Sequence, residues 1–178
     1  MTTIHRWLPQ QLLRAITAAA LACCVSAPVL ADPALPETPT ALARLHDLTS
    51  RASDLVKEAM TMIGIRYRYG GTAPESGLDC SGLVRYVFKE ARGTELPRTS
   101  QEISRLGEKV DTKDLQPGDL VFYNTLRRSF SHVGIYLGDN KFIHSPAPGG
   151  EVRIESMDVG YWKKRFNGAR RLIDSPQQ

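Results

Sequence analysis

The sequence predicts an α+β domain in which helices come first and an antiparallel sheet follows. Apolar residues recur at helical spacing in segments 53–64 and 79–92. Between residues 120 and 173, short β-branched and aromatic runs alternate with Gly, Pro, Asn and Asp, a pattern typical of strands. The chain has 178 residues, 42% of them hydrophobic, which is enough for one packed domain but too few for two.

Each expected helix has its own boundary signals. The first is predicted over 53–64, and the second starts at Asp79, a good N-cap, and ends at Gly93. The third opens with the capping-box pattern TSQE at 99–102 and extends to Leu106. Five strands are predicted, at 120–123, 133–137, 142–143, 152–154 and 169–173.

Two histidines flank the hairpin between the second and third strands. His132 opens one strand and His144 closes the next. A three-residue loop at 138–140 would pair Leu137 with Lys141. The two imidazoles would then lie on one face as diagonal neighbours, within about 7–8 Å of each other. A two-residue loop would place them on opposite faces.

The N-terminus has the pattern of a secretory signal peptide. Residues 1–31 contain Arg6 and Arg14 but no acid, followed by an apolar run and small residues up to Ala31. We expect cleavage after Ala31 and export to the periplasm or the exterior. A lipoprotein cleaved at Cys23 is the less favoured alternative, because a small residue stands where such a site has a bulky one.

The rest of the chain divides into a Pro-rich spacer at 32–50, a domain at 51–174 and a tail at 175–178. Without the leader, 21 basic and 19 acidic residues remain, so the formal charge falls from +4 to about +2. This balance argues against a nucleic-acid partner. The mature chain has no apolar run of about 18 residues, so we expect no transmembrane span in it. We also expect the protein to be a monomer.

Cys80 is the one cysteine left after the leader is removed. At the first turn of a helix its thiolate would be favoured, so we expect its pKa to be lowered. A nucleophilic cysteine needs a base, and His132 and His144 are the candidates. The rival interpretation, a zinc site made by these three residues, lacks a short chelating pair and a fourth ligand. We therefore expect no metal and no cofactor.

Six short motifs follow one another along the domain: YRYGG at 67–71, DCSGLV at 79–84, LPRTS at 96–100, PGDLVFY at 117–123, SHVGIYLGD at 131–139 and FIH at 142–144. Together, and in this order, they resemble the NlpC-type family of papain-like cell-wall cysteine peptidases. The resemblance covers about residues 53–172.

The resemblance implies a role for each matching residue. Cys80 would be the nucleophile, His132 the general base and acid, and His144 the orienting third member. The Tyr67 hydroxyl would help to line the oxyanion site. The residues expected beside the substrate cleft are Asp79, Ser81 and Ser131. Arg98, in the LPRTS motif, is expected to have a structural or a cleft role.

The resemblance further implies a substrate, the stem peptides of peptidoglycan. We expect hydrolysis through a thioester, at the bond between D-γ-glutamate and a diamino acid first and at the crosslink bond second. Asp79 could bind a substrate amine, and Arg98 or the basic run 163–165 a carboxylate. The alternatives are an amidase or acyltransferase with the same three residues, and a catalytically silent wall-binding module.

Overall fold

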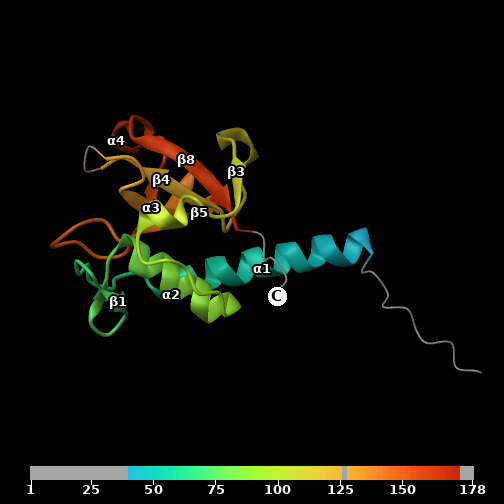
Figure 1. The fold of residues 1–178 in the computed structure, drawn as a ribbon, viewed down its shortest axis with the longest axis horizontal. Coiled ribbons are helices and arrows are strands. Elements are labelled where there is room, and N and C mark those ends of the chain that lie inside the picture. Colours follow the sequence, from blue (N-terminus) through green and yellow to red (C-terminus); the bar gives the residue numbers. More distant parts are fainter. Residues whose placement is uncertain (1–39, 126–127, 173–178) are drawn as a thin grey trace, which may run out of the picture. The chain divides into compact units, whose positions relative to one another are not determined.

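The structure, a computed structural model, describes residues 40–125 and 128–172. The expected leader, the proline-containing part of the spacer and the tail lie outside the described residues. No helix within the described ranges has the length and apolar character needed to cross a membrane. The elements are, in chain order, α1 (Ala41–Thr61), β1 (Thr72–Ala73), β2 (Gly77–Leu78), α2 (Cys80–Arg92), α3 (Ser100–Ile103), β3 (Glu108–Val110), a 3-10 turn (Thr112–Asp114), β4 (Leu120–Tyr123), β5 (His132–Gly138), β6 (Lys141–His144), β7 (Arg153–Ser156), α4 (Gly160–Lys163) and β8 (Phe166–Arg171) (Figure 1).

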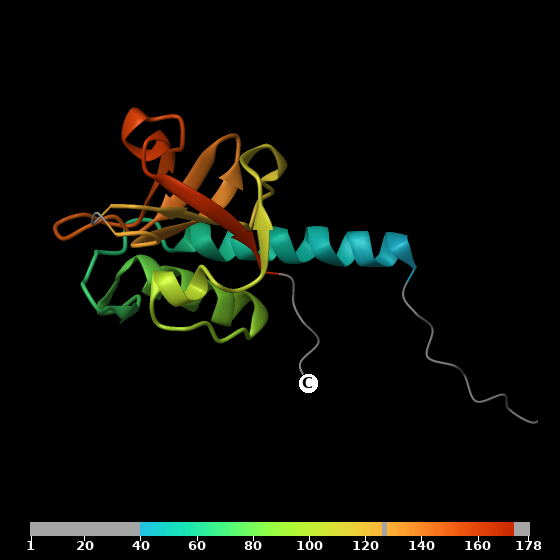
Figure 2. The ribbon, with the colours of Figure 1, turned by 45° about the horizontal axis from the view of Figure 1, so that its top comes forward.

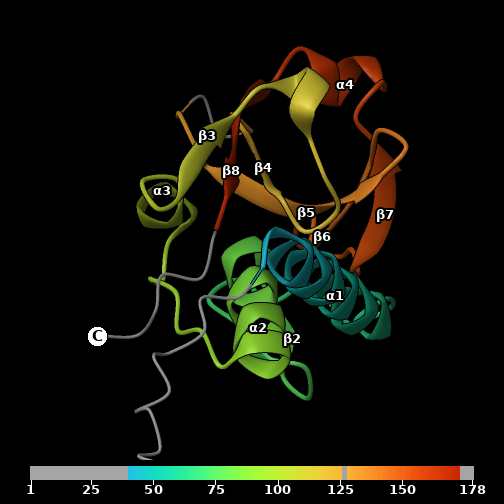
Figure 3. The same ribbon diagram turned by 90° about the vertical axis from the view of Figure 1, so that its right-hand side faces the viewer.

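Six strands form one antiparallel sheet in the order β3-β8-β4-β5-β6-β7. The helices α1 and α2 lie side by side against one face of this sheet, and α4 lies on the other (Figure 3). Figure 2 shows the same layers from another side. The predicted α+β class, with helices before an antiparallel sheet, is confirmed.

The sheet separates two apolar clusters because successive side chains of a strand point to opposite faces. The cluster under α1 and α2 contains, among others, Leu55, Leu83, Val87, Phe122, Val133 and Ile143. The cluster on the α4 side contains Val121, Tyr123, Tyr136, Phe142, Trp162 and Ala169. His132 and His144 lie on the α4 side, where both rings contact Trp162.

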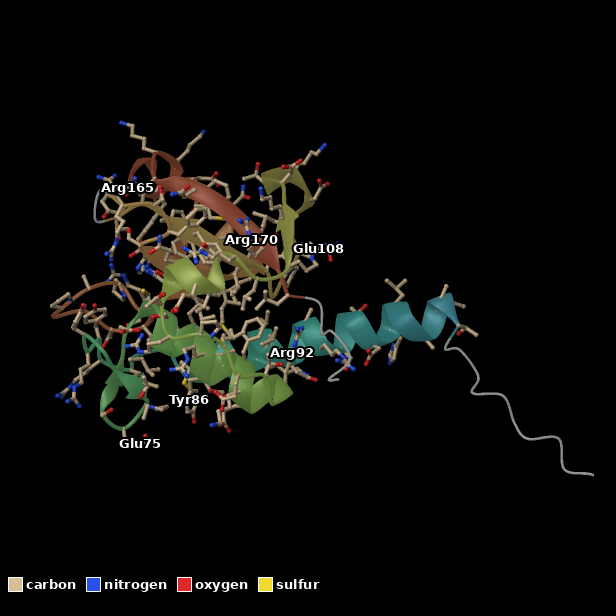
Figure 4. The ribbon with its side chains drawn as sticks, in the orientation of Figure 1. Glu75, Tyr86, Arg92, Glu108, Arg165 and Arg170 are labelled. Carbon is tan, nitrogen blue, oxygen red and sulfur yellow. The ribbon has the colours of Figure 1, made fainter. Side chains whose placement is uncertain are left out.

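The first helix begins at Ala41, much earlier than predicted, so the expected spacer is helical over its last ten residues. The prolines that suggested a spacer end at position 39. Thr40 then caps the helix by accepting a hydrogen bond from the Ala43 N–H. Local capping and helix propensity form these turns without burial, since Leu42 and Leu45 are 79% and 62% exposed. The side chains of these first turns that the structure describes are exposed to solvent (Figure 4).

The β5–β6 turn differs from the prediction, yet it gives the predicted register. Gly138, rather than Leu137, pairs with Lys141, so the loop holds only Asp139 and Asn140, both with positive φ. A bulge at Leu137 supplies the extra residue. Beyond it, Tyr136 pairs with Phe142 and Ile135 with Ile143, as the three-residue loop would have required.

The existence or the bounds of several short helices and strands could not be predicted from the sequence pattern. The strand β3 and the short helix α4 were not predicted, because three or four polar and aromatic residues carry no clear period. The strand β8 begins at Phe166, three residues before the prediction. The capping box at Thr99 and Glu102 is present, but the helix that it opens ends at Ile103.

Candidate active site

The helix α2 begins at the floor of a cleft, with Cys80 as its first residue. Asp79 is the predicted N-cap, and its carboxylate accepts hydrogen bonds from the N–H groups of Gly82 at 2.7 Å and Gly70 at 3.0 Å. A Cβ on Gly82 would lie 2.0 Å from the Gly71 carbonyl oxygen. The glycines therefore let the loop before α2 lie directly against the first turn of the helix, which fixes the position of Cys80.

Asp79 and Arg98 form an ion pair with each other, so the two charges expected to meet a substrate amine and a substrate carboxylate are already partnered in the free protein. Both carboxylate oxygens of Asp79 accept from the Arg98 guanidinium. Ser81 completes the group, because its hydroxyl donates to Asp79 at 3.0 Å and accepts from Arg98 at 2.8 Å. Asp79 is only 7% exposed and Ser81 5%. The side chain of Arg98 is 38% exposed in the cleft, whereas that of Asp79 is 10% exposed.

The thiol of Cys80 packs against the apolar cluster below the sheet. Burial, and next the Asp79 carboxylate, raise its pKa to about 11, while the backbone N–H groups of Val133, Ser81 and Cys80 lower it. The predicted lowering of the thiol pKa is therefore wrong for the free protein. Desolvation of the anion outweighs the helix terminus, which supplies only part of a charge. The Val133 amide facing the sulfur places the thiol at the start of β5.

His132 and His144 contact each other as the hairpin register requires. Nε2 of His132 lies 2.8 Å from Nδ1 of His144. His132 is 4% exposed and His144 is fully buried. Since Nε2 of His132 faces His144, its Nδ1 is the nitrogen left to act toward the cleft.

Both histidines are neutral in the free protein. Burial lowers the pKa of His132 to about 3, assisted by His144, while Glu155 and Asp79 raise it. Burial and then Arg153 lower the pKa of His144 to about 3. The resting site therefore holds a thiol beside a neutral imidazole, and charge develops only when a proton moves.

The cleft has a volume of about 440 Å³. All the predicted site residues line it except His144, which lies behind His132. Burial, and next Cys80 and Asp79, raise the pKa of Tyr67, so its hydroxyl stays protonated and can donate. The Ser131 hydroxyl accepts from the Thr125 N–H at 2.9 Å. The lining residues are Tyr67, Tyr69, Gly70, Asp79, Cys80, Ser81, Arg98, Thr99, Ser100, Thr125, Arg128, Ser131, His132, Pro146, Ala147 and Pro148.

The basic run 163–165 is not part of this lining. The Arg165 guanidinium lies 3.8 Å from the centre of the Tyr161 ring and donates to the Tyr161 carbonyl. Figure 4 shows Arg165 beside α4. The alternative in which this run binds a substrate carboxylate in the cleft is not supported by its position. Within 40–125 and 128–172, no three His, Cys, Asp or Glu side chains are grouped so that they could hold a metal ion.

Two residues beside the histidines were missed from the sequence. The Trp162 ring stacks on His132, with centroids 5.5 Å apart, and its edge meets His144. The Trp162 N–H donates to the carboxylate of Glu155. Glu155 lies opposite Phe142 in the β6–β7 pair, hence on the same face as His144. If the β6–β7 register had been known, the alternation of side chains along the strands would have predicted that Glu155 lies on the face of His144.

The geometry can be compared with known proteins. The family model described as NlpC/P60 matches residues 64–171. The chain belongs to the NlpC/P60 family. The family resemblance seen in the six sequence motifs is thereby confirmed. The matched residues include the cysteine, both histidines and the strand that carries Glu155.

Several proteins named as murein endopeptidases or glutamyl hydrolases are similar in sequence. The murein DD-endopeptidase MepS/murein LD-carboxypeptidase of Escherichia coli K12 is 42% identical over 132 residues, which are 74% of this chain and 67% of the relative. The murein DD-endopeptidase MepH of the same organism is 41% identical over 66% of this chain and 45% of its own. The gamma-DL-glutamyl hydrolase of Bacillus subtilis is 42% identical over 66% of this chain and 29% of its own. The chain thus matches less than half of the length of the last two.

Solved NlpC/P60 structures share the fold. The NlpC/P60 domain of the peptidoglycan hydrolase SagA has a TM-score of 0.60 and 31% identity, over 68% of this chain and 98% of that domain. An NlpC/P60 family protein from Bacillus cereus has a TM-score of 0.64 and 35% identity, over 69% of this chain and 40% of its own.

Proposed function

We propose that this chain is a cysteine peptidase that hydrolyses stem peptides of peptidoglycan. One observation carries the proposal: a cleft lined by Cys80 at a helix start and by His132, whose far nitrogen lies 2.8 Å from His144. A thiol, a base and an orienting group are the three parts of a nucleophilic site. The names of the similar proteins, murein endopeptidases and a glutamyl hydrolase, support the substrate class.

Acylation begins with a neutral pair. Nδ1 of His132 takes the thiol proton as the sulfur of Cys80 attacks the substrate carbonyl carbon. The Cys80 N–H, a first-turn donor without an intrahelical acceptor, and the Tyr67 hydroxyl stabilise the oxyanion. The imidazolium then gives its proton to the leaving amine nitrogen, the C–N bond breaks and a thioester remains.

Deacylation repeats these steps with water. Nδ1 of His132 takes a proton from a water molecule whose oxygen attacks the thioester carbon. The C–S bond breaks, the sulfur leaves as a thiolate and takes the proton back, and a carboxylic acid product departs. Only side chains and backbone groups of this chain are used.

The names of the relatives, rather than the geometry of the cleft, support a choice between the two bonds. Of the three relatives described above, whose names each state a bond, the DD-endopeptidase MepS matches over 67% of its length, and the glutamyl hydrolase is equally identical over only 29% of its own. We therefore place the crosslink bond first and the D-γ-glutamyl bond second, the reverse of the order that the sequence suggested. The family resemblance in the sequence favours the glutamyl bond, and the Asp79–Arg98 ion pair weakens the charge complementarity that accompanied that preference.

Digestion of purified peptidoglycan, with products identified by mass, tests the proposal. Conversion of dimeric muropeptides to intact monomeric stems would support the crosslink bond, and release of disaccharide-dipeptides would support the glutamyl bond. Release of whole stem peptides from the sugar would indicate an amidase. Wall binding without any product would indicate a silent binding module. The Cys80→Ala variant controls for a contaminating hydrolase.

We further propose that the protein is exported and that its mature form begins at Asp32. The charge and apolar pattern of residues 1–31 supports this. N-terminal sequencing of the protein recovered from the cell envelope tests it. A lipid-modified Cys23 at the N-terminus would contradict a soluble exported form.

A further inference from the structure

His144 has a polar atom that the Cys–His–His arrangement leaves unexplained. Its Nδ1 faces His132, but its Nε2 is buried and has no hydrogen-bond partner among the described residues. A buried, unpaired N–H or lone pair costs about 1–3 kcal/mol. The Glu155 carboxylate lies close by, with its Oε1 3.6 Å from this nitrogen.

The Glu155 carboxylate is held in this position from two sides. The Trp162 N–H donates to Oε2, and Arg153 Nε donates to Oε1 at 2.5 Å. The side chain of Glu155 is 23% exposed, and that of His144 is fully buried. The carboxylate is thus anchored beside the imidazole by groups on β7 and α4, with Arg153 as the other charge at the site.

The chemistry of a carboxylate decides which tautomers fit. An ionised carboxylate only accepts hydrogen bonds, so a proton on His144 Nε2 is favoured. Nδ1 of His144 then carries a lone pair and accepts from Nε2–H of His132. Nδ1 of His132 is left as a lone pair, which is the form that can take the thiol proton. The opposite tautomers would set a lone pair of His144 against the carboxylate and leave His132 Nδ1 already protonated.

We propose that Glu155 is a positioning residue that fixes the productive tautomers of both histidines by accepting the Nε2–H of His144. A relay Cys80–His132–His144–Glu155 results, with Trp162 holding its last member. The negative charge also raises the pKa of His132 and so favours the imidazolium that forms during attack. The activity part of this inference rests on the proposed function, whereas the tautomers do not.

The tautomers can be read directly from the imidazole nitrogen chemical shifts of protein labelled with ¹⁵N-histidine, at neutral pH. We expect protonated Nε2 and unprotonated Nδ1 in both His132 and His144 of the unmodified protein. An unprotonated Nε2 on His144 would overturn the proposal. This measurement needs neither a variant nor turnover, so it stands even if the protein does not cleave peptidoglycan.

Variants then connect the tautomers to turnover. Glu155→Met removes the acceptor at similar length and should lower kcat about tenfold or more, with KM unchanged. Glu155→Gln keeps an acceptor oxygen and should lose less. Glu151→Met, a change at an exposed carboxylate outside the cleft lining, is the matched control and should keep full kcat. Wild-type kcat and tautomers in a folded Glu155→Met protein would contradict the assignment.

Discussion

On the helical side of the cleft the Asp79 carboxylate beside Cys80 is fully paired, whereas on the sheet side buried polar atoms near the histidines have no hydrogen-bond partner in the described chain. Asp79 accepts from Gly70, Gly82 and Arg98. On the sheet side, Nε2 of His144 and the Tyr123 hydroxyl lack such a partner. The paired side fixes the position of the sulfur. The side with unpaired atoms is where the proton is transferred, and there a single carboxylate, that of Glu155, lies close enough to orient the imidazoles.

The largest expected effect comes from removing one reacting group from each side. Cys80→Ala and His132→Ala should each lower turnover by about a thousandfold or more, and the double variant should be little worse, because the two groups act as a unit. His144→Ala should cost less, since it acts through His132. Muropeptide digestion measures the rates, and thermal unfolding checks the fold. If the loss of turnover in the double variant equalled the product of the two single losses, the two groups would act independently, against this prediction.

The second expected effect concerns the thiol itself. Because burial raises the pKa of Cys80 to about 11, its alkylation at pH 7 should be at least about tenfold slower than that of an unperturbed thiol with a pKa near 8.5. The rate should rise with pH through an inflection above 8.5. A plateau of fast alkylation at neutral pH, lost in His132→Ala, would instead indicate a preformed thiolate–imidazolium pair.

Breaking the paired side should affect stability. Asp79→Ala removes an N-cap and leaves Arg98 without its carboxylate, so we expect the free energy of unfolding to fall by about 2–3 kcal/mol. The matched control is Asp54→Ala on α1, where an exposed carboxylate lies 3.4 Å from Lys57. It should cost less than about 1 kcal/mol. Urea unfolding measures both, and equal losses would mean that the Asp79 network adds no stability.

The unpaired side should control how stability depends on pH. His132 and His144 stay neutral in the folded protein, with pKa values lowered to about 3, while the unfolded chain binds protons near pH 6.5. Stability is therefore full above 6.5 and falls as the pH drops toward 3. Each histidine contributes up to about 1.4 kcal/mol per pH unit. His144→Gln should reduce this slope in urea unfolding series, and an unchanged slope would locate the acid sensitivity elsewhere.

Sequence analysis located the reacting residues because their signals are local. The short motif that contains Asp79 and Cys80 is enough to predict the start of a helix. His132 and His144 lie on two strands joined by a short turn, so the turn length predicts their relative position. Glu155 could not be found in this way, because the long connection from β6 to β7 follows no turn rule and so does not define a register. The pairing of Asp79 with Arg98 depends on how α2 packs against the segment before α3. Local patterns contain no information on that packing.

Because of the bulge at Leu137, the register of β5 and β6 depends on the number of residues in their connection but not on which residues these are. Asp139 and Asn140 contact no reacting group, and other residues that tolerate positive φ could replace them. Loss of a single residue there would shift β6 by half a pleat, turning His144 toward the helices and Ile143 toward Trp162. Across divergent sequences, substitutions should therefore accumulate in this turn while insertions and deletions are eliminated. The chain would lose its relay through a change in spacing even with every functional side chain retained.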